Sequence, residues 1–128
     1  MKKLLVAILC LCIPAIAHHS MAGFDRSQAL TLEGVVKNFA WQNPHAWIEL
    51  EVTKDGKVTT WNFEMTAPAY LVRAGWKKTS VKPGDKITVV GNPLKTGEPG
   101  ALFVSVTLAD GTKLGQQGGG GAGKAAAK

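Results

Sequence analysis

The sequence predicts a mostly β fold: a small five-stranded Greek-key barrel with one short helix between its third and fourth strands. Five segments between residues 29 and 108 alternate apolar and polar side chains as β-strands do, and turn sequences separate them. Gly34 interrupts the first and longest segment, as expected of a strand that bends to serve both sides of a barrel. This order is typical of the oligonucleotide/oligosaccharide-binding (OB) barrel, whereas an immunoglobulin-like sandwich needs about seven strands.

The first three strands are predicted from their alternation. The first covers residues 29–41. In residues 45–53 we expect one set of side chains in the core (Ala46, Ile48, Leu50, Val52) and the other outside (His45, Trp47, Glu49, Glu51). Asp55-Gly56 predicts a tight hairpin into the third strand, residues 57–65. That strand is expected to bury Trp61, Phe63 and Met65 and to expose Thr60, Asn62 and Glu64.

The short helix is predicted from its end signals. Thr66 is expected to cap its N-terminus, Pro68 suits its first turn, and Gly75 should end it before Trp76 returns to the core. A turn at residues 82–85 leads to a fourth strand over residues 86–91, with Ile87 and Val89 inward, and a long loop follows. The fifth strand, residues 101–108, is expected to bury Leu102, Val104, Val106 and Leu108.

The first 17 residues have the features of a secretory signal peptide. Lys2 and Lys3 precede an apolar run over residues 4–13, and Ala15-Ile16-Ala17 fits the cleavage rule. A run of about 10 apolar residues is too short for a membrane span, which needs about 20. Leucines precede both Cys10 and Cys12, where a lipoprotein anchor needs a small residue. We therefore expect cleavage after Ala17 and a periplasmic protein that does not span the membrane.

The chain accordingly divides into four parts. We expect a signal peptide over residues 1–17, an N-terminal arm over 18–28, the barrel over 29–114 and a disordered tail over 115–128. The glycine, alanine and lysine tail has no large apolar residue whose burial could offset the entropy of ordering. Loss of the two signal-peptide lysines lowers the formal charge from +6 to +4. The remaining lysines are scattered, which argues against nucleic-acid binding.

The histidines predict a metal site. Both cysteines lie in the signal peptide, so the mature chain has no thiolate ligand. Cleavage after Ala17 would place the amine and imidazole of His18 at the new N-terminus, where both can bind one metal ion. His19 or His45 would supply a further imidazole for Cu(II) or Zn(II), and the Met21 thioether suits Cu(I). We predict copper in preference to zinc.

Two other interpretations of the histidines stay open. Cleavage after Ile16 would place His19 at the third position, which is the amino-terminal copper-and-nickel motif. Alternatively, the paired histidines are solvated, and His45 only forms a hydrogen bond within its turn.

A second functional hypothesis rests on aromatic residues. Trp41, Trp47 and Phe103, with Glu49, are candidates for an exposed face that recognises a peptide, a glycan or an envelope protein. Glu49 and Glu51 would lie about 7 Å apart along one strand face, but no nucleophile motif or phosphate-binding glycine loop accompanies them. We therefore predict a binding protein without enzymatic activity.

Several sequence blocks resemble a known family. They are His18-His19-Ser20-Met21-Ala22 with Phe24-Asp25, Leu32-Glu33-Gly34-Val35-Val36, Trp41-Gln42-Asn43-Pro44-His45, Gly75-Trp76, Lys82-Pro83-Gly84-Asp85, Gly91-Asn92-Pro93 and Ser105-Val106-Thr107-Leu108. Together they resemble small exported bacterial proteins that are grouped as a domain of unknown function. The resemblance covers residues 18–114. It implies a periplasmic protein and no particular activity, substrate or cofactor.

Overall fold

The computed structural model describes residues 21–116. Its elements, in chain order, are η1 (Met21–Gly23), β1 (Leu30–Ala40), β2 (Trp47–Lys54), β3 (Lys57–Glu64), α1 (Pro68–Arg73), β4 (Lys86–Pro93), β5 (Gly100–Thr107) and β6 (Lys113–Gly115). The predicted signal peptide, His18, His19 and most of the predicted tail lie outside the described residues.

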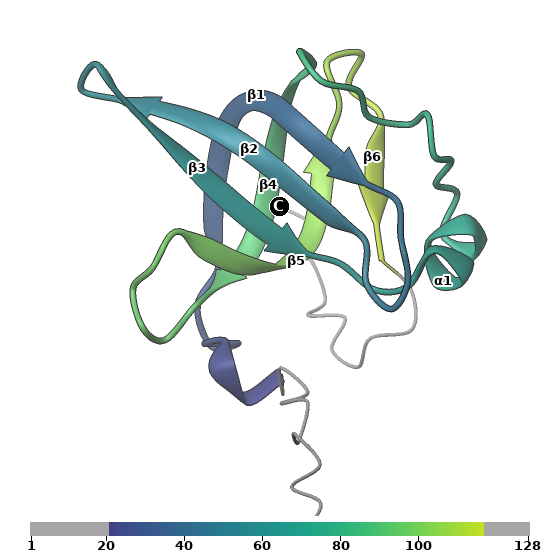
Figure 1. The fold of residues 1–128 in the computed structure, drawn as a ribbon, viewed down its shortest axis with the longest axis horizontal. Helices are drawn as coiled ribbons and strands as arrows, with labels where there is room; N and C mark the ends of the chain where they lie inside the picture. Colours follow the sequence, from purple (N-terminus) through teal and green to yellow (C-terminus); the bar gives the residue numbers. More distant parts are fainter. Residues whose placement is uncertain (1–20, 117–128) are drawn as a thin grey trace, which may run out of the picture.

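Five strands close into a barrel. Neighbours in the order β3-β2-β1-β4-β5 pair antiparallel, and a parallel pairing between β3 and β5 closes the ring (Figure 1). The short β6 pairs with the end of β5. With α1 between β3 and β4, this is the Greek-key order of an OB barrel. The predicted fold class is confirmed.

The first strand is bent and serves both sides of the barrel. Its residues 30–35 pair with β4 and its residues 35–40 pair with β2. The bend was expected at Gly34, but the register changes between Val36 and Asn38, which makes Lys37 the bulged residue. Gly34 serves a different purpose, because a Cβ atom there would collide with the carbonyl oxygen of Glu51. The glycine allows β1 to cross closely over β2.

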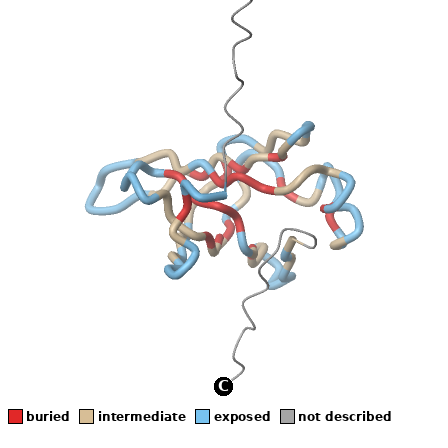
Figure 2. Tube along the Cα trace, turned by 90° about the horizontal axis from the view of Figure 1, so that it is seen from below, coloured by how far each residue is buried: buried red, intermediate tan, exposed pale blue. Residues whose placement is uncertain are grey.

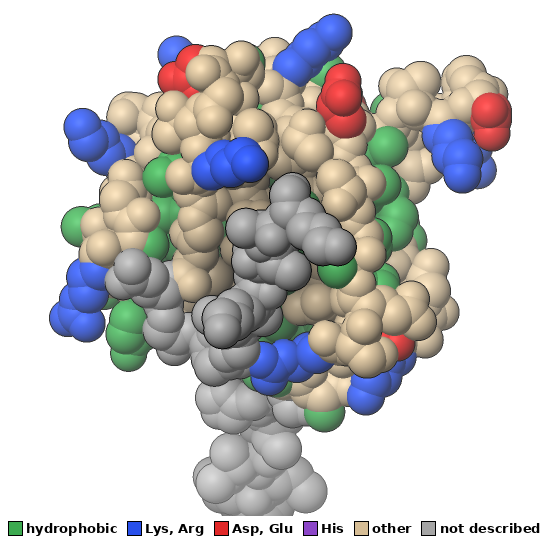
Figure 3. Space-filling model, turned by 180° about the vertical axis from the view of Figure 1, so that it is seen from behind, with side chains coloured by type: hydrophobic (Ala, Val, Ile, Leu, Met, Phe, Trp, Pro, Cys, Tyr) green, Lys and Arg blue, Asp and Glu red, His purple; other side chains and the backbone are tan. Residues whose placement is uncertain are grey.

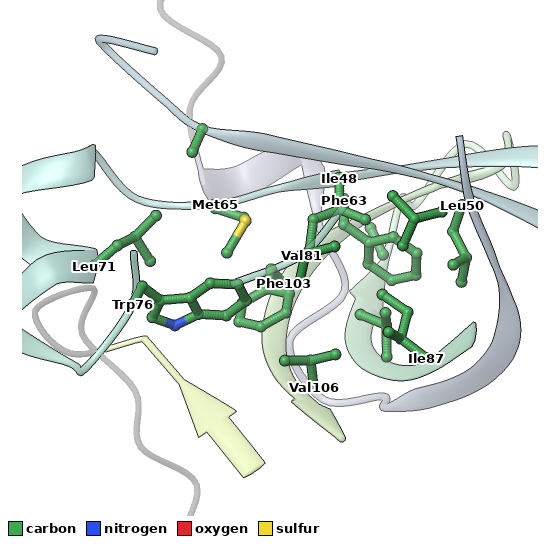
Figure 4. Close-up of a cluster of buried hydrophobic side chains, with 14 residues drawn as sticks. Ile48, Leu50, Phe63, Met65, Leu71, Trp76, Val81, Ile87, Phe103 and Val106 are labelled. Atoms are coloured by element: carbon green, nitrogen blue, oxygen red, sulfur yellow. The ribbon is translucent and has the colours of Figure 1, made fainter. Parts of the chain in front are cut away.

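The core contains most of the side chains that the alternation predicts, but Val52, Trp61 and Leu108 are half-buried at its margin. Ile48, Leu50, Phe63 and Met65 are all buried (Figure 4), and Figure 2 shows the buried stretches of chain in the middle of the molecule. Trp76 also returns to the core as predicted, where its ring lies 5.6 Å from that of Phe103 and 5.8 Å from that of Phe39. The tryptophan N–H donates to the carbonyl of Gly115 at 2.7 Å. Its polar end is therefore satisfied although the ring is 1% exposed.

The fifth strand departs from the prediction. Val104, expected in the core, is 39% exposed, whereas Phe103, expected on the surface, is 1% exposed. The pairing of β4 with β5 explains the exchange: Val90 lies opposite Ser105 and Gly91 opposite Phe103, so Val104 is an extra residue. Such a bulge shifts the inward alternation by one position.

Both ends of the predicted helix can be compared with the structure. Ala67, and not Thr66, is the N-cap residue; Pro68 occupies the first turn, and Gly75 follows the helix with a φ of 93°. The Thr66 N–H instead donates to the side chain of Gln116 at 2.8 Å.

The barrel also extends past the predicted boundary at residue 114. Gly115 belongs to β6, and the Gln116 side chain donates to the Phe103 carbonyl at 2.8 Å. These two residues had been assigned to the tail.

Candidate functional site

His45 and Glu64 form a close pair at one end of the β2–β3 hairpin. The Nδ1 atom of His45 lies 2.5 Å from Oε1 of Glu64. The histidine side chain is 42% exposed and the glutamate side chain 8% exposed. Among residues 21–116, Glu64 is the one buried charged residue. A carboxylate held away from water therefore has an imidazole at the surface as its partner.

The strand register explains why these two side chains meet. In the β2–β3 ladder, Trp47 lies opposite Glu64, and His45 precedes Trp47 by two residues. Alternation therefore places all three on the outer face of the sheet. The alternation predicts this outer face for Glu64, but the expectation that its side chain is exposed there is wrong. Its other neighbour is Leu102 of β5, in the parallel pairing that closes the barrel, so this part of the outer face is covered.

The pair leaves one imidazole nitrogen available. When the Nδ1–H of a neutral imidazole donates to a carboxylate, the lone pair on Nε2 remains free to bind a metal ion or accept a proton. A carboxylate behind a histidine is the usual arrangement around metal-binding histidines, because it holds the ring and raises its basicity. The same contact also has a purely structural role, since a buried carboxylate without a partner is costly.

Met21 lies on a separate part of the molecule. It belongs to η1 and is 40% exposed. The following Phe24 is buried and bridges to Leu94, and the Asp25 N–H donates to the carbonyl of Pro93 at 2.8 Å. The arm is thus attached to the end of β4 and the loop that follows it. Within residues 21–116 no three His, Cys, Asp or Glu side chains lie close enough to hold a metal ion.

The aromatic candidates are not brought onto one surface. Phe103 is in the core, so its assignment to an exposed face is wrong, and the bulge at Val104 is the reason. Trp41 is half-buried and packs edge-on against Phe39, with ring centroids 5.7 Å apart. Trp47 and Glu49 are also half-buried, and these two share the outer face of β2.

Two open hollows lie elsewhere on the barrel. One of about 290 Å³ is lined by Thr79, Ser80, Lys82, Asp85, Ile87, Leu108, Ala109 and Asp110. The other, of about 180 Å³, is lined by Glu33, Gly34, Val35, Glu51, Thr53 and Lys86. Neither includes His45 or Trp47.

The match to a family model covers residues 6–103 and concerns DUF6152, a family of unknown function. The chain belongs to this family. No curated protein and no solved structure matches it. The matched residues of this DUF6152 protein include both His45 and Glu64. No helix in its described part, residues 21–116, has the length and apolar character needed to cross a membrane.

Proposed function

We propose that this protein is a periplasmic, non-catalytic copper-binding protein. The observation that supports it is the His45–Glu64 pair, in which a buried carboxylate orients a partly exposed imidazole. In this proposal Nε2 of His45 is one ligand, and the amine and imidazole of His18 complete a three-nitrogen set after cleavage behind Ala17. His19 and Met21 are further donors on the same arm. Such a site suits copper storage, delivery or sensing.

The pairing of segments in the barrel is compatible with one metal site shared by His18 and His45. Phe24 bridges to the β4–β5 loop, Gly100 at the end of that loop pairs with Asn62, and Glu64 is two residues further along β3. Three strand spacings of about 4.8 Å thus separate the arm from β3, or about 14 Å. With η1 retained over Met21–Gly23, the three residues from His18 to Met21 can span about 10 Å when extended, and η1 adds about 6 Å. Together these lengths, about 16 Å, bring His18 as far as β3 when the arm runs toward that strand.

Calorimetric titration of the mature protein with Cu(II) tests this function. The sample should begin at His18, verified by mass spectrometry. We expect one bound ion, loss of binding in His45→Ala and His18→Ala, and about tenfold weaker binding in Glu64→Gln, because the carboxylate only orients the ligand. Zn(II) should bind more weakly than Cu(II).

Two controls sharpen the titration. Trp47→Ala alters the same outer face without removing a ligand, so its copper affinity should equal that of the unaltered protein. A protein with one additional residue before His18 keeps every imidazole but displaces the terminal amine, and it should bind copper weakly. Unchanged affinity in both histidine variants would refute the proposal.

A further inference from the structure

The first half of β3 has no neighbour on the side that faces away from β2. β5 pairs with β3 along Asn62–Glu64 alone, and within the described part of the chain no strand pairs with residues 57–61 on that side. Figure 1 shows these residues leaving the barrel with β2 as a projecting hairpin. The sheet therefore ends here in an unpaired edge.

Val58 and Thr60 direct their main-chain groups to this edge. The Asn62 N–H donates to the carbonyl of Pro99 at 3.2 Å, on the side where β5 lies. Because main-chain groups alternate between the two sides of a strand, residues 60 and 58 face the same side as residue 62. The two-residue turn at Asp55-Gly56 supports this assignment of Val58 and Thr60 to the open side. Its closing residues, Lys54 and Lys57, hydrogen-bond to each other across the hairpin, so the next residue, Val58, directs its main-chain groups away from β2. Two N–H and two C=O groups are thus available for pairing.

Acidic side chains on β2, one strand in from the edge, favour a basic partner. Glu49 and Glu51 are half-buried on the outer face of β2, and no ion pair between residues 21 and 116 involves either of them. Val58, on the same face, is 56% exposed. On the opposite face Trp61 is half-buried. Figure 3 shows the back of the barrel, where lysine and arginine side chains are scattered without forming a continuous patch.

We propose that the edge of β3 accepts an additional strand from a partner polypeptide that carries lysine or arginine at alternating positions. The main chain of Val58 and Thr60 would pair with it, as in other cases of strand addition. Its basic side chains would extend over Thr60 and Asn62 toward Glu51 and Glu49 on β2, and its apolar side chains would cover Trp61. Lys57, at the start of the edge, repels a basic side chain beside it, so we expect the basic residues of the partner near Glu49 and Glu51 and not near the hairpin turn. This inference is independent of copper binding.

Titration with a synthetic hexapeptide of alternating lysine and valine tests the proposal, with backbone NMR of the mature protein as the readout. We expect amide shifts confined to residues 57–62 and to the outer face of β2. The same peptide with glutamate in place of lysine should not bind. Thr60→Pro removes an N–H that faces the open side, so the fold should survive, whereas the peptide should bind about tenfold more weakly. Val58→Pro repeats the test at the second edge residue.

Charge variants test the choice of partner. Glu51→Gln should weaken binding of the lysine peptide about threefold, whereas Asp110→Asn, at an exposed acid in the turn after β5, should leave it unchanged. Equal binding of the glutamate peptide, or full binding by folded Thr60→Pro and Val58→Pro, would overturn the proposal. So would a dimer in sedimentation experiments that either proline variant dissociates, because the occupant would then be a second copy of this chain.

Discussion

At the scale of single residues, the His45–Glu64 pair combines a structural and a chemical role. Glu64 is buried because the parallel pairing with β5 covers the end of β3. Since His45 is its hydrogen-bond partner in the structure, the imidazole is held in place while the side chain stays 42% exposed. The same contact that offsets the cost of a buried carboxylate thus orients a potential ligand.

Removal of the imidazole should measure the structural role. We expect His45→Ala to lower the free energy of unfolding by about 2 kcal/mol, because it leaves the Glu64 carboxylate buried without a partner. The double variant His45→Ala/Glu64→Leu should recover part of this loss, since both polar groups are then gone. Urea unfolding followed by tryptophan fluorescence measures both values. Equal stability of His45→Ala and the unaltered protein would show that the pair contributes nothing to the fold.

At the scale of elements, the irregular positions of β1 and β5 decide how the barrel closes. The bulge at Lys37 and the close crossing at Gly34 let one strand pair with β4 and then with β2. The bulge at Val104 turns Phe103 into the core, where it contacts Trp76. Each irregularity changes the direction of a strand without ending it.

A methyl group at residue 34 should disturb the crossing of β1 over β2. In Gly34→Ala the added Cβ would collide with the Glu51 carbonyl oxygen and would lie 2.9 Å from Cγ of Leu50. We expect a loss of about 2 kcal/mol in unfolding free energy, as for other overpacked sites. Gly23→Ala is the matched control, because nothing lies within 4 Å of its added Cβ, and its stability should change by less than about 0.5 kcal/mol. Similar values for both variants would contradict this account of Gly34.

At the scale of the whole molecule, contacts between the two halves of the chain complete the domain. The end of the described chain returns to α1 and β5: the Gly115 carbonyl accepts from Trp76, and Gln116 joins Thr66 to Phe103. Two of these hydrogen bonds connect residues 115 and 116 to the segments on either side of α1, and the third connects Gln116 to β5. Residues 115 and 116 therefore belong to the barrel, and their loss should affect its core.

Two truncations locate the end of the domain. A chain that stops at Gln116 should match the full mature protein in stability. A chain that stops at Leu114 loses three hydrogen bonds and should be less stable by about 3 kcal/mol. Thermal unfolding of the two chains side by side gives the comparison. If the two truncated chains unfold at the same temperature, residues 115 and 116 do not contribute to the domain, and its boundary lies at residue 114.

Local pattern in the sequence was enough for most of the fold and for half of the candidate site. Alternation along residues 45–53 predicts His45 outward and Ile48 and Leu50 inward. This prediction needs only the local sequence, because successive side chains of a strand point to opposite faces. Tertiary structure alone decided the burial of Glu64 and of Phe103. Both depend on β5. Its parallel pairing with β3 covers Glu64, and its bulge at Val104 turns Phe103 into the core. Such pairings join segments that are far apart in the sequence, so the local alternation of apolar and polar residues does not predict them.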